Sequence, residues 1–284
     1  MSWVFVIRKF AILVAALAFS GSAFAADMAV KAPPAPPPLA YNWTGAYIGA
    51  NIGGGWSDRN VSYSPNDPLA AALFGGAAGA PPAASLKDSG VLGGLQLGYN
   101  WRFNRNWLVG LETDFDWSGA KGSGFSGGVL AGGAVPFTNT VSERVDWFGT
   151  ARARLGYLPT NSLLTYITGG FAYGRIQTTG NYASGGSIFG NIPPFGFVCT
   201  PGTACFSGSS GSMDIGWTVG AGFEYALWQN VTFKAEYLYV SLNSSKSITE
   251  TALNPNGNAL LSSFNANFNN MAFSVARAGF NYHF

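Results

Sequence analysis

The sequence predicts an all-β protein, specifically an eight-stranded antiparallel transmembrane up-and-down β-barrel with long extracellular loops. The first observation is residues 107–117, which alternate between an apolar face and a face carrying three acids. Trp107 and Trp117 end the apolar face, and 11 residues tilted by about 45° are what a strand needs to cross a bilayer. The second is a charged content of only 10%, and the third is a strict alternation of short and long connections. Both are typical of outer-membrane barrels.

Composition excludes some classes of function. The chain has 284 residues with 39 glycines, 15% aromatic residues and a formal net charge of +2. Arg8 and Lys9 lie in a segment that we expect to be removed, so the mature chain is nearly neutral. No basic excess indicates nucleic acid.

Residues 1–25 are predicted to be a signal peptide. Arg8 and Lys9 precede an apolar run over 10–19, and Ala23 and Ala25 supply small residues at the cleavage positions. The run is too short for a transmembrane helix. Residues 26–42 follow as a proline-rich periplasmic linker of the polyproline II type.

Residues 43–284 are predicted to form the barrel. Eight alternating segments are expected as strands: 43–56, 91–101, 107–117, 143–157, 163–173, 214–225, 231–240 and 272–284. Three short turns are expected at 102–106, 158–162 and 226–230, and four long irregular loops at 57–90, 118–142, 174–213 and 241–271. Short turns face the periplasm in such barrels, so both termini are expected there and the loops outside.

The inward faces of these strands are expected to hold an ion-pair network. By alternation they carry seven acids and five bases: Glu112, Asp114, Asp116, Asp146, Asp214, Glu224, Glu236, Arg144, Arg152, Arg154, Lys234 and Arg277. Unpaired charges in a narrow lumen would be poorly solvated, so we expect Glu112 or Asp114 to lie near Arg152 or Arg154.

Two interpretations of this network are open. The charges neutralise one another and plug the barrel, or they line a narrow path for small ions. Eight strands enclose a space that side chains fill, which argues against a wide diffusion pore.

No catalytic residue, metal site or cofactor is predicted. The one histidine, His283, stands beside the C-terminus with no serine or cysteine nucleophile placed against it, and we expect it to be a solvated rim residue. Cys199 and Cys205, six positions apart in a region rich in glycine and serine, are expected to form a disulfide in an oxidising compartment. The neighbouring apolar stretch 192–198 is either a self-packed loop tip or a contact surface.

Four segments, 43–56, 93–101, 168–174 and 277–284, resemble the small outer-membrane proteins of alphaproteobacteria, often called outer-membrane immunogenic or porin-family proteins. The resemblance implies an eight-stranded barrel in the outer membrane of a Gram-negative bacterium, with lipids and lipopolysaccharide around it. It implies that the barrel assembly machinery reads the final aromatic residues, Phe280, Tyr282 and Phe284. It also implies attachment to peptidoglycan through a mature start at Ala26 and Asp27.

The function expected is non-enzymatic: envelope integrity and surface exposure by a monomeric barrel, with a possible tether to the wall. One alternative is a narrow porin or ion channel, and another is an adhesin or receptor that acts through the loops. A soluble β-protein of the lipocalin type is the alternative fold, but its outer face should be polar.

Overall fold

The computed structural model describes residues 41–284 except 76–82, 131–134 and 244–245. The predicted signal peptide, most of the linker, and Ala26 and Asp27 lie outside the described residues.

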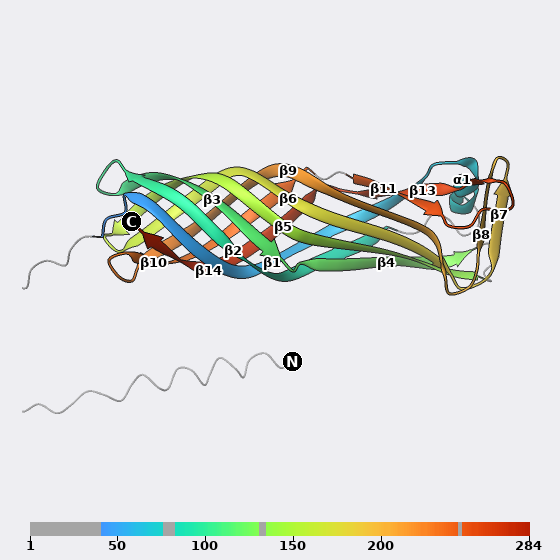
Figure 1. Ribbon diagram of the computed structural model, residues 1–284, viewed down its shortest axis with the longest axis horizontal. Helices are drawn as coiled ribbons and strands as arrows, with labels where there is room; N and C mark the ends of the chain where they lie inside the picture. Colours follow the sequence, from blue (N-terminus) through green and yellow to red (C-terminus); the bar gives the residue numbers. More distant parts are fainter. Residues whose placement is uncertain (1–40, 76–82, 131–134, 244–245) are drawn as a thin grey trace, which may run out of the picture. The chain divides into compact units, whose positions relative to one another are not determined.

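Eight antiparallel strands form a closed ring, which confirms the predicted fold class (Figure 1). In ring order they are β1 (Gly45–Pro65), β2 (Ala84–Arg102), β3 (Trp107–Ser118), β5 (Val135–Thr160), β6 (Leu163–Ser184), β9 (Ala204–Ala226), β10 (Val231–Leu242) and β14 (Met271–His283). Strand β14 pairs with β1 from Phe273–Ser57 to His283–Tyr47, and this pairing closes the ring. Closure leaves no unpaired sheet edge in the bilayer.

We name the part of the ring that contains β3, β10 and β14 the lower ring. Its outward face is apolar between two aromatic belts. The outer belt consists of Trp56, Trp117, Trp147, Trp217 and Tyr239, and the inner belt of Tyr99, Trp101, Trp107, Tyr157 and Tyr225. Between them the exposed side chains include Ile52, Leu95, Leu111, Ile167 and Val219. This is the surface that hydrocarbon requires, and it excludes the lipocalin alternative.

The ring continues beyond the outer belt as a second tier, which we name the extension. There β4 (Lys121–Leu130), β11 (Lys246–Ala252) and β13 (Ser263–Phe268) take the places of β3, β10 and β14, while β1, β2, β5, β6 and β9 run on. The expectation of long irregular loops is therefore wrong. These segments are rich in glycine, serine, threonine and asparagine, so hydropathy does not alternate along them. Their backbones nevertheless pair along the described lengths of β4, β5, β6 and β9.

A small tip closes the far end of the extension (Figure 1). It contains α1 (Pro68–Gly75), the hairpin β7 (Ile188–Ile192) and β8 (Phe195–Cys199), and β12 (Leu260–Leu261). Asp67 caps α1, because its Oδ1 accepts hydrogen bonds from the amides of Leu69 and Ala70 at 3.0 and 2.9 Å. Of the helices in the described part of the chain, none has the length and apolarity to cross a membrane.

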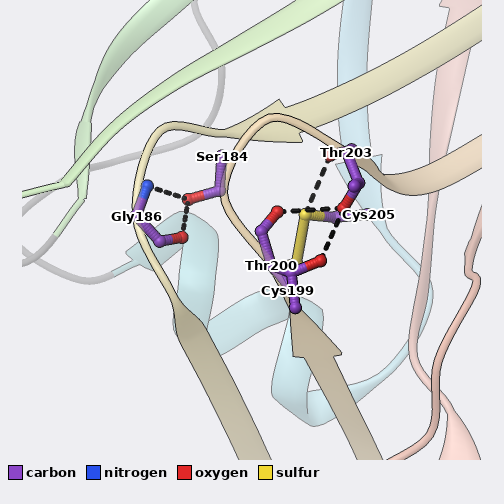
Figure 2. Close-up of a disulfide and its surroundings, with 6 residues drawn as sticks. All are labelled: Ser184, Gly186, Cys199, Thr200, Thr203 and Cys205. Atoms are coloured by element: carbon purple, nitrogen blue, oxygen red, sulfur yellow. Dashed lines mark hydrogen bonds between the residues drawn. A yellow bond between two sulfur atoms is a disulfide. The ribbon is translucent and has the colours of Figure 1, made fainter.

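The predicted disulfide between Cys199 and Cys205 is confirmed (Figure 2). Both cysteines are buried at the tip, with Cα atoms 5.1 Å apart. They pack in a cluster with Phe197, Phe206 and Phe264. Residues 195–198 are therefore packed against the protein itself, as the self-packed interpretation expects, whereas Ile192, Pro193 and Pro194 are exposed.

Candidate functional site: an ion network in the lumen

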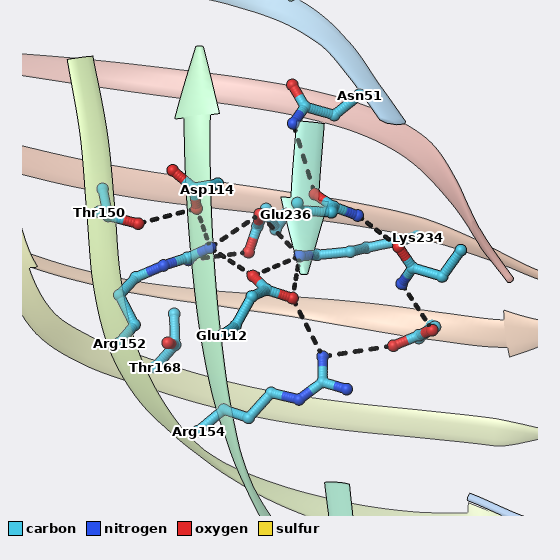
Figure 3. Close-up of polar contacts among 12 residues, drawn as sticks. Asn51, Glu112, Asp114, Thr150, Arg152, Arg154, Thr168, Lys234 and Glu236 are labelled. Carbon is cyan, nitrogen blue, oxygen red and sulfur yellow. Dashed lines mark hydrogen bonds and ion pairs between the residues drawn. The ribbon is translucent and has the colours of Figure 1, made fainter. Parts of the chain in front are cut away.

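Charged side chains from five strands meet inside the lower ring. We name this set the network; its members are Glu112, Asp114 and Asp116 on β3, Arg152 and Arg154 on β5, Glu224 on β9, Lys234 and Glu236 on β10, and Arg277 and His283 on β14. All ten are at most 5% exposed. Figure 3 shows the central members pointing toward one another across the lumen.

Glu112 is a central carboxylate of the network. It accepts hydrogen bonds from Arg152 Nη2 at 2.5 Å, from Lys234 Nζ at 2.7 and 2.8 Å, and from the Tyr47 hydroxyl at 2.6 Å. Arg154 Nη1 lies 3.5 Å from Oε2 of Glu112. Three cations and one hydroxyl thus replace the water that burial removes.

Asp114 and Asp116 bind the cations nearest the outer end of the network. Asp114 Oδ2 lies 2.7 Å from both Arg152 Nη2 and Arg277 Nη2 and accepts a third bond from the Thr150 hydroxyl at 2.7 Å. Asp116 pairs with Nη1 of the same Arg277. One guanidinium therefore bridges two carboxylates of one strand, as its fork of donors allows.

Glu236 forms ion pairs with three cations from three strands. Arg277 Nε donates to it at 2.7 Å and Arg152 Nη1 at 3.1 Å, and Lys234 Nζ lies 3.1 Å away. The Tyr166 hydroxyl donates at 3.2 Å. Arg152 is thus shared by three carboxylates, those of Glu112, Asp114 and Glu236.

Glu224 and His283 form the inner end of the network, and here the expectation was wrong. His283 is not a solvated rim residue: it is 3% exposed, its Nε2 lies 3.0 Å from Glu224 Oε1, and its ring stacks on Tyr47 at 5.1 Å. Trp43, which precedes β1, covers it edge-on. The histidine completes the pairing of a buried carboxylate, and nothing in this geometry supplies it with a nucleophile.

Two glycines make room for these side chains. A Cβ on Gly98 would stand 2.1 Å from the Tyr47 hydroxyl, and a Cβ on Gly49 would stand 2.0 Å from Asn281 Oδ1. Such residues allow a narrow ring to hold the neutral partners Tyr47 and Asn281 beside the charged side chains.

Apolar layers cover both ends of the network. Toward the extension lies an apolar layer of Leu92, Val145, Phe148, Ala172, Ile176, Leu238, Val240, Leu242, Met271, Phe273 and Val275. A cavity of only about 10 Å³ touches this layer, which is at most enough for one water molecule. At the inner end Trp43, Leu108, Leu158, Leu164 and Tyr166 pack together.

Three residues predicted for the network lie elsewhere. Arg144 points outward and its side chain is 48% exposed, and Asp146 pairs with it at 2.7 Å on that outer surface. The expectation that both face the lumen is wrong, because a β-bulge at Asp146 reverses the alternation of β5: Val145 pairs with Ile176, but Trp147 pairs with Arg175. Asp214 does point inward, but it binds Lys246 at 2.6 Å, apart from the network.

Sequence reasoning missed a second buried ion pair. Arg59 Nη1 donates to both oxygens of Glu143, at 2.8 and 2.9 Å, inside the extension. Arg59 was assigned to a loop and Glu143 to the start of a strand, and the only signal available was that one acid and one base each stand in a polar segment. The neutral partners Tyr47, Tyr166 and Asn281 could not be predicted from the pairing of opposite charges, because they carry none.

Within the described ranges, no group of three or more histidine, cysteine, aspartate or glutamate side chains has the arrangement of a metal site. Inside the network each acid has a cation or hydroxyl donor beside it. What this arrangement does chemically is hold opposite charges together at buried positions in the lumen.

Comparison with known proteins agrees with the fold. Residues 11–284 match the family model described as outer membrane protein beta-barrel domain. The chain is 33% identical to the 31 kDa outer-membrane immunogenic protein of Brucella melitensis biotype 1 over 94% of this chain and 95% of that one. It is 28% identical to the 25 kDa outer-membrane immunogenic protein of Brucella canis, over 81% of this chain and 82% of that one.

Among solved structures, the outer membrane protein OprG from Pseudomonas aeruginosa aligns with 86% of this chain and 98% of its own, at 14% identity and a TM-score of 0.39. The family match and the Brucella relatives agree with the closed ring and its two aromatic belts. This chain is therefore an integral outer-membrane protein that belongs to the outer-membrane β-barrel family, among the small outer-membrane proteins of alphaproteobacteria.

Proposed function

We propose that this protein is a closed, non-conducting and non-enzymatic barrel that contributes to envelope integrity and carries its tip to the cell surface. The observation that carries the proposal is the apolar layer between the network and the extension. Phe148 and Phe273 meet there edge to face, with ring centroids 5.3 Å apart. An ion that crossed the network would next have to cross this layer without a polar partner, which is costly.

The proposed orientation places both termini in the periplasm. Short turns at 103–106, 161–162 and 227–230 lie at the end of the ring that also holds the C-terminus, and the extension lies at the other end (Figure 1). Outer-membrane barrels keep short turns inside and long segments outside. The buried tip cluster and its disulfide then face the exterior, where oxidising conditions preserve a disulfide.

A measurement of ion conductance distinguishes this proposal from the channel alternative. Refolded full-length mature protein in a planar bilayer is expected to be silent, while heat-dependent mobility in detergent gels shows that the barrel is folded. The variant Phe148→Ala/Phe273→Ala opens the apolar layer and is expected to give more openings than the matched exposed variant Phe125→Ala/Phe189→Ala. Steady openings of folded wild-type protein would overturn the proposal.

The envelope role is tested in cells. A deletion strain is expected to become sensitive to detergent, and the full-length gene, but not an empty vector, is expected to restore resistance. A version that lacks the tip should restore it too. Lost binding to host cells with an intact envelope would instead favour the adhesin alternative.

The tether to peptidoglycan stays a prediction. It requires an amide bond from the amino group of Ala26, and digestion of purified sacculi followed by mass spectrometry would detect the linked peptide. A free amine on Ala26 throughout such a preparation would contradict it.

A further inference from the structure

We propose that a basic patch on the outer wall of the extension binds the phosphate groups of lipopolysaccharide in the surrounding outer leaflet. The patch consists of Lys87 on β2, Lys121 on β4, Arg144 on β5 and Arg175 on β6. The inference rests on the proposed orientation, with the extension outside the cell.

The four side chains all point away from the barrel axis and are exposed. The strand register brings them together: Lys121 is the direct partner of Arg144 on β5, and Lys87 pairs with Ser123, one step diagonally from Lys121. Diagonal neighbours on adjacent strands lie about 7–8 Å apart, within reach of one phosphorylated head group.

Folding alone does not explain this grouping. Like charges placed directly opposite each other on antiparallel strands destabilise a sheet, and Lys121 and Arg144 are so placed. Among the described residues neither Lys87 nor Lys121 forms an ion pair. A ligand of negative charge would turn this repulsion into attraction.

The acids on this surface do not neutralise the patch. Asp146 is shared between Arg144 at 2.7 Å and Arg175 at 3.8 Å, so one carboxylate serves two guanidinium groups. Asp58 stands opposite Lys87 in the register but forms no ion pair with it in the described structure. Of the other bases in the extension, Arg59 and Lys246 point inward to Glu143 and Asp214.

A groove accompanies the charges. It has a volume of about 630 Å³, and its lining includes Lys87, Lys121 and Arg144 together with the hydroxyls of Ser123, Ser142 and Thr179. Hydroxyl groups beside cations suit a phosphorylated sugar, which offers both hydroxyls and anionic oxygens.

The position of the patch along the barrel axis indicates that its ligand comes from the membrane. Arg175 is the direct partner of Trp147 in the outer belt, and Lys87 is two residues beyond Ser89, the partner of Trp56. Two residues of strand correspond to about 7 Å, so the patch begins where the aromatic belt ends. Belts of this kind mark the lipid–water interface, next to which the phosphates of the outer leaflet lie.

The direction of the side chains supports the same source. On β6, Arg175 has the same parity as Tyr173 and Phe171, and on β2, Lys87 has the same parity as Val91 and Leu95. Because these apolar residues face lipid, the basic residues face the lipid head groups beside the barrel. A soluble polyanion would meet the tip first.

The test is a titration of refolded full-length mature protein in detergent with bisphosphorylated lipid A, followed by native mass spectrometry. The variant is Lys87→Gln/Lys121→Gln. The control, Arg102→Gln/Arg105→Gln, removes the same charge from the periplasmic turn. Heat-dependent mobility and bilayer silence, measured on the same preparations, check folding and the proposed function separately.

Wild type and control are expected to bind bisphosphorylated lipid A at least about tenfold more tightly than dephosphorylated lipid A, a difference of about 1.4 kcal/mol. The Lys87→Gln/Lys121→Gln variant is expected to lose this discrimination. Equal binding by folded variant and wild type would overturn the site. So would wild-type protein that ignores lipid A but binds a soluble sulfated polysaccharide, which would assign the patch to a different partner.

Discussion

Lys234 on β10 reaches Glu112 on β3, the strand directly opposite it in the ring, with Nζ 2.7 Å from Oε1. Because the two strands share no backbone pairing, this contact spans the lumen itself. The network therefore connects opposite walls of the barrel and holds them at a fixed separation.

Removal of Arg152, the cation shared by three carboxylates, is expected to lower the free energy of unfolding strongly. Arg152→Ala leaves Glu112, Asp114 and Glu236 short of a shared partner, and breaking a buried ion pair costs about 3–5 kcal/mol. The free energy of unfolding in urea, measured in lipid vesicles, checks this. The control Arg144→Ala removes an exposed arginine and is expected to cost no more than about 1 kcal/mol. Equal losses for the two variants would show that the network does not stabilise the barrel.

Gly98→Ala is expected to destabilise the barrel by about 1–3 kcal/mol, because a new methyl group would overlap the Tyr47 ring, whose Cζ lies 2.3 Å from the position of the added Cβ. Gly93→Ala on the same strand is the control, since its nearest atom there is 3.4 Å away. Denaturant midpoints of both variants against wild type give the comparison. A midpoint for Gly98→Ala as high as that for Gly93→Ala would contradict the tight fit.

The extension is expected to weaken as the pH rises. Burial raises the pKa of Glu250 from about 4.5 to about 7, and Asn139 is its hydrogen-bond donor at 3.4 Å. Below pH 4.5 the carboxyl is neutral in the folded and unfolded chains, and no penalty arises. Between pH 4.5 and 7 only the unfolded chain loses the proton, so stability falls, and above pH 7 the penalty is complete at up to about 3 kcal/mol.

Glu250→Gln tests this pH dependence, because an amide does not titrate. The variant is expected to match wild type at pH 4 and to exceed it at pH 8 in the denaturant midpoint of the extension. Asp58→Asn, which alters an exposed carboxylate, serves as the control. A difference between Glu250→Gln and wild type that stays constant from pH 4 to pH 8 would rule out this mechanism.

The disulfide is expected to stabilise the tip and not the barrel. A loop closed over six residues is worth about 2–3 kcal/mol by the chain-entropy relation. Cys199→Ser/Cys205→Ser should therefore be cut faster by protease near residues 186–203, while heat-dependent mobility stays unchanged. Reduction of wild type with dithiothreitol should reproduce the effect, and unchanged cleavage in both cases would refute it.

The lower ring could be predicted because its two environments differ so strongly. Residues 107–117 face hydrocarbon on one side and a packed lumen on the other, so uncharged and charged side chains alternate from Leu111 to Trp117. The pairing of Glu112 and Asp114 with Arg152 followed from alternation and from the cost of a lone buried charge. The partners from more distant strands, such as Lys234, required knowledge of strand order across the ring.

The rest could not be predicted, for local reasons. One bulge at Asp146 reversed the faces of Arg144 and Val145, and alternation alone carries no sign of an inserted residue. In the extension, water replaces hydrocarbon outside, so glycine, serine and threonine occur on the outward face and the polarity contrast fades. His283 was placed by its nearness to the chain end, whereas Trp43 and Tyr41 fold over it.

The extension acts as a stalk. On β6 it runs from Arg175 to Ser184, ten residues that span about 30 Å at 3.3 Å per residue. In the proposed orientation this length of strand carries α1 and the β7–β8 hairpin away from the membrane surface. Antibodies would then reach these few tip segments first, and changes there could accumulate without disturbing the part of the protein that holds it in the membrane.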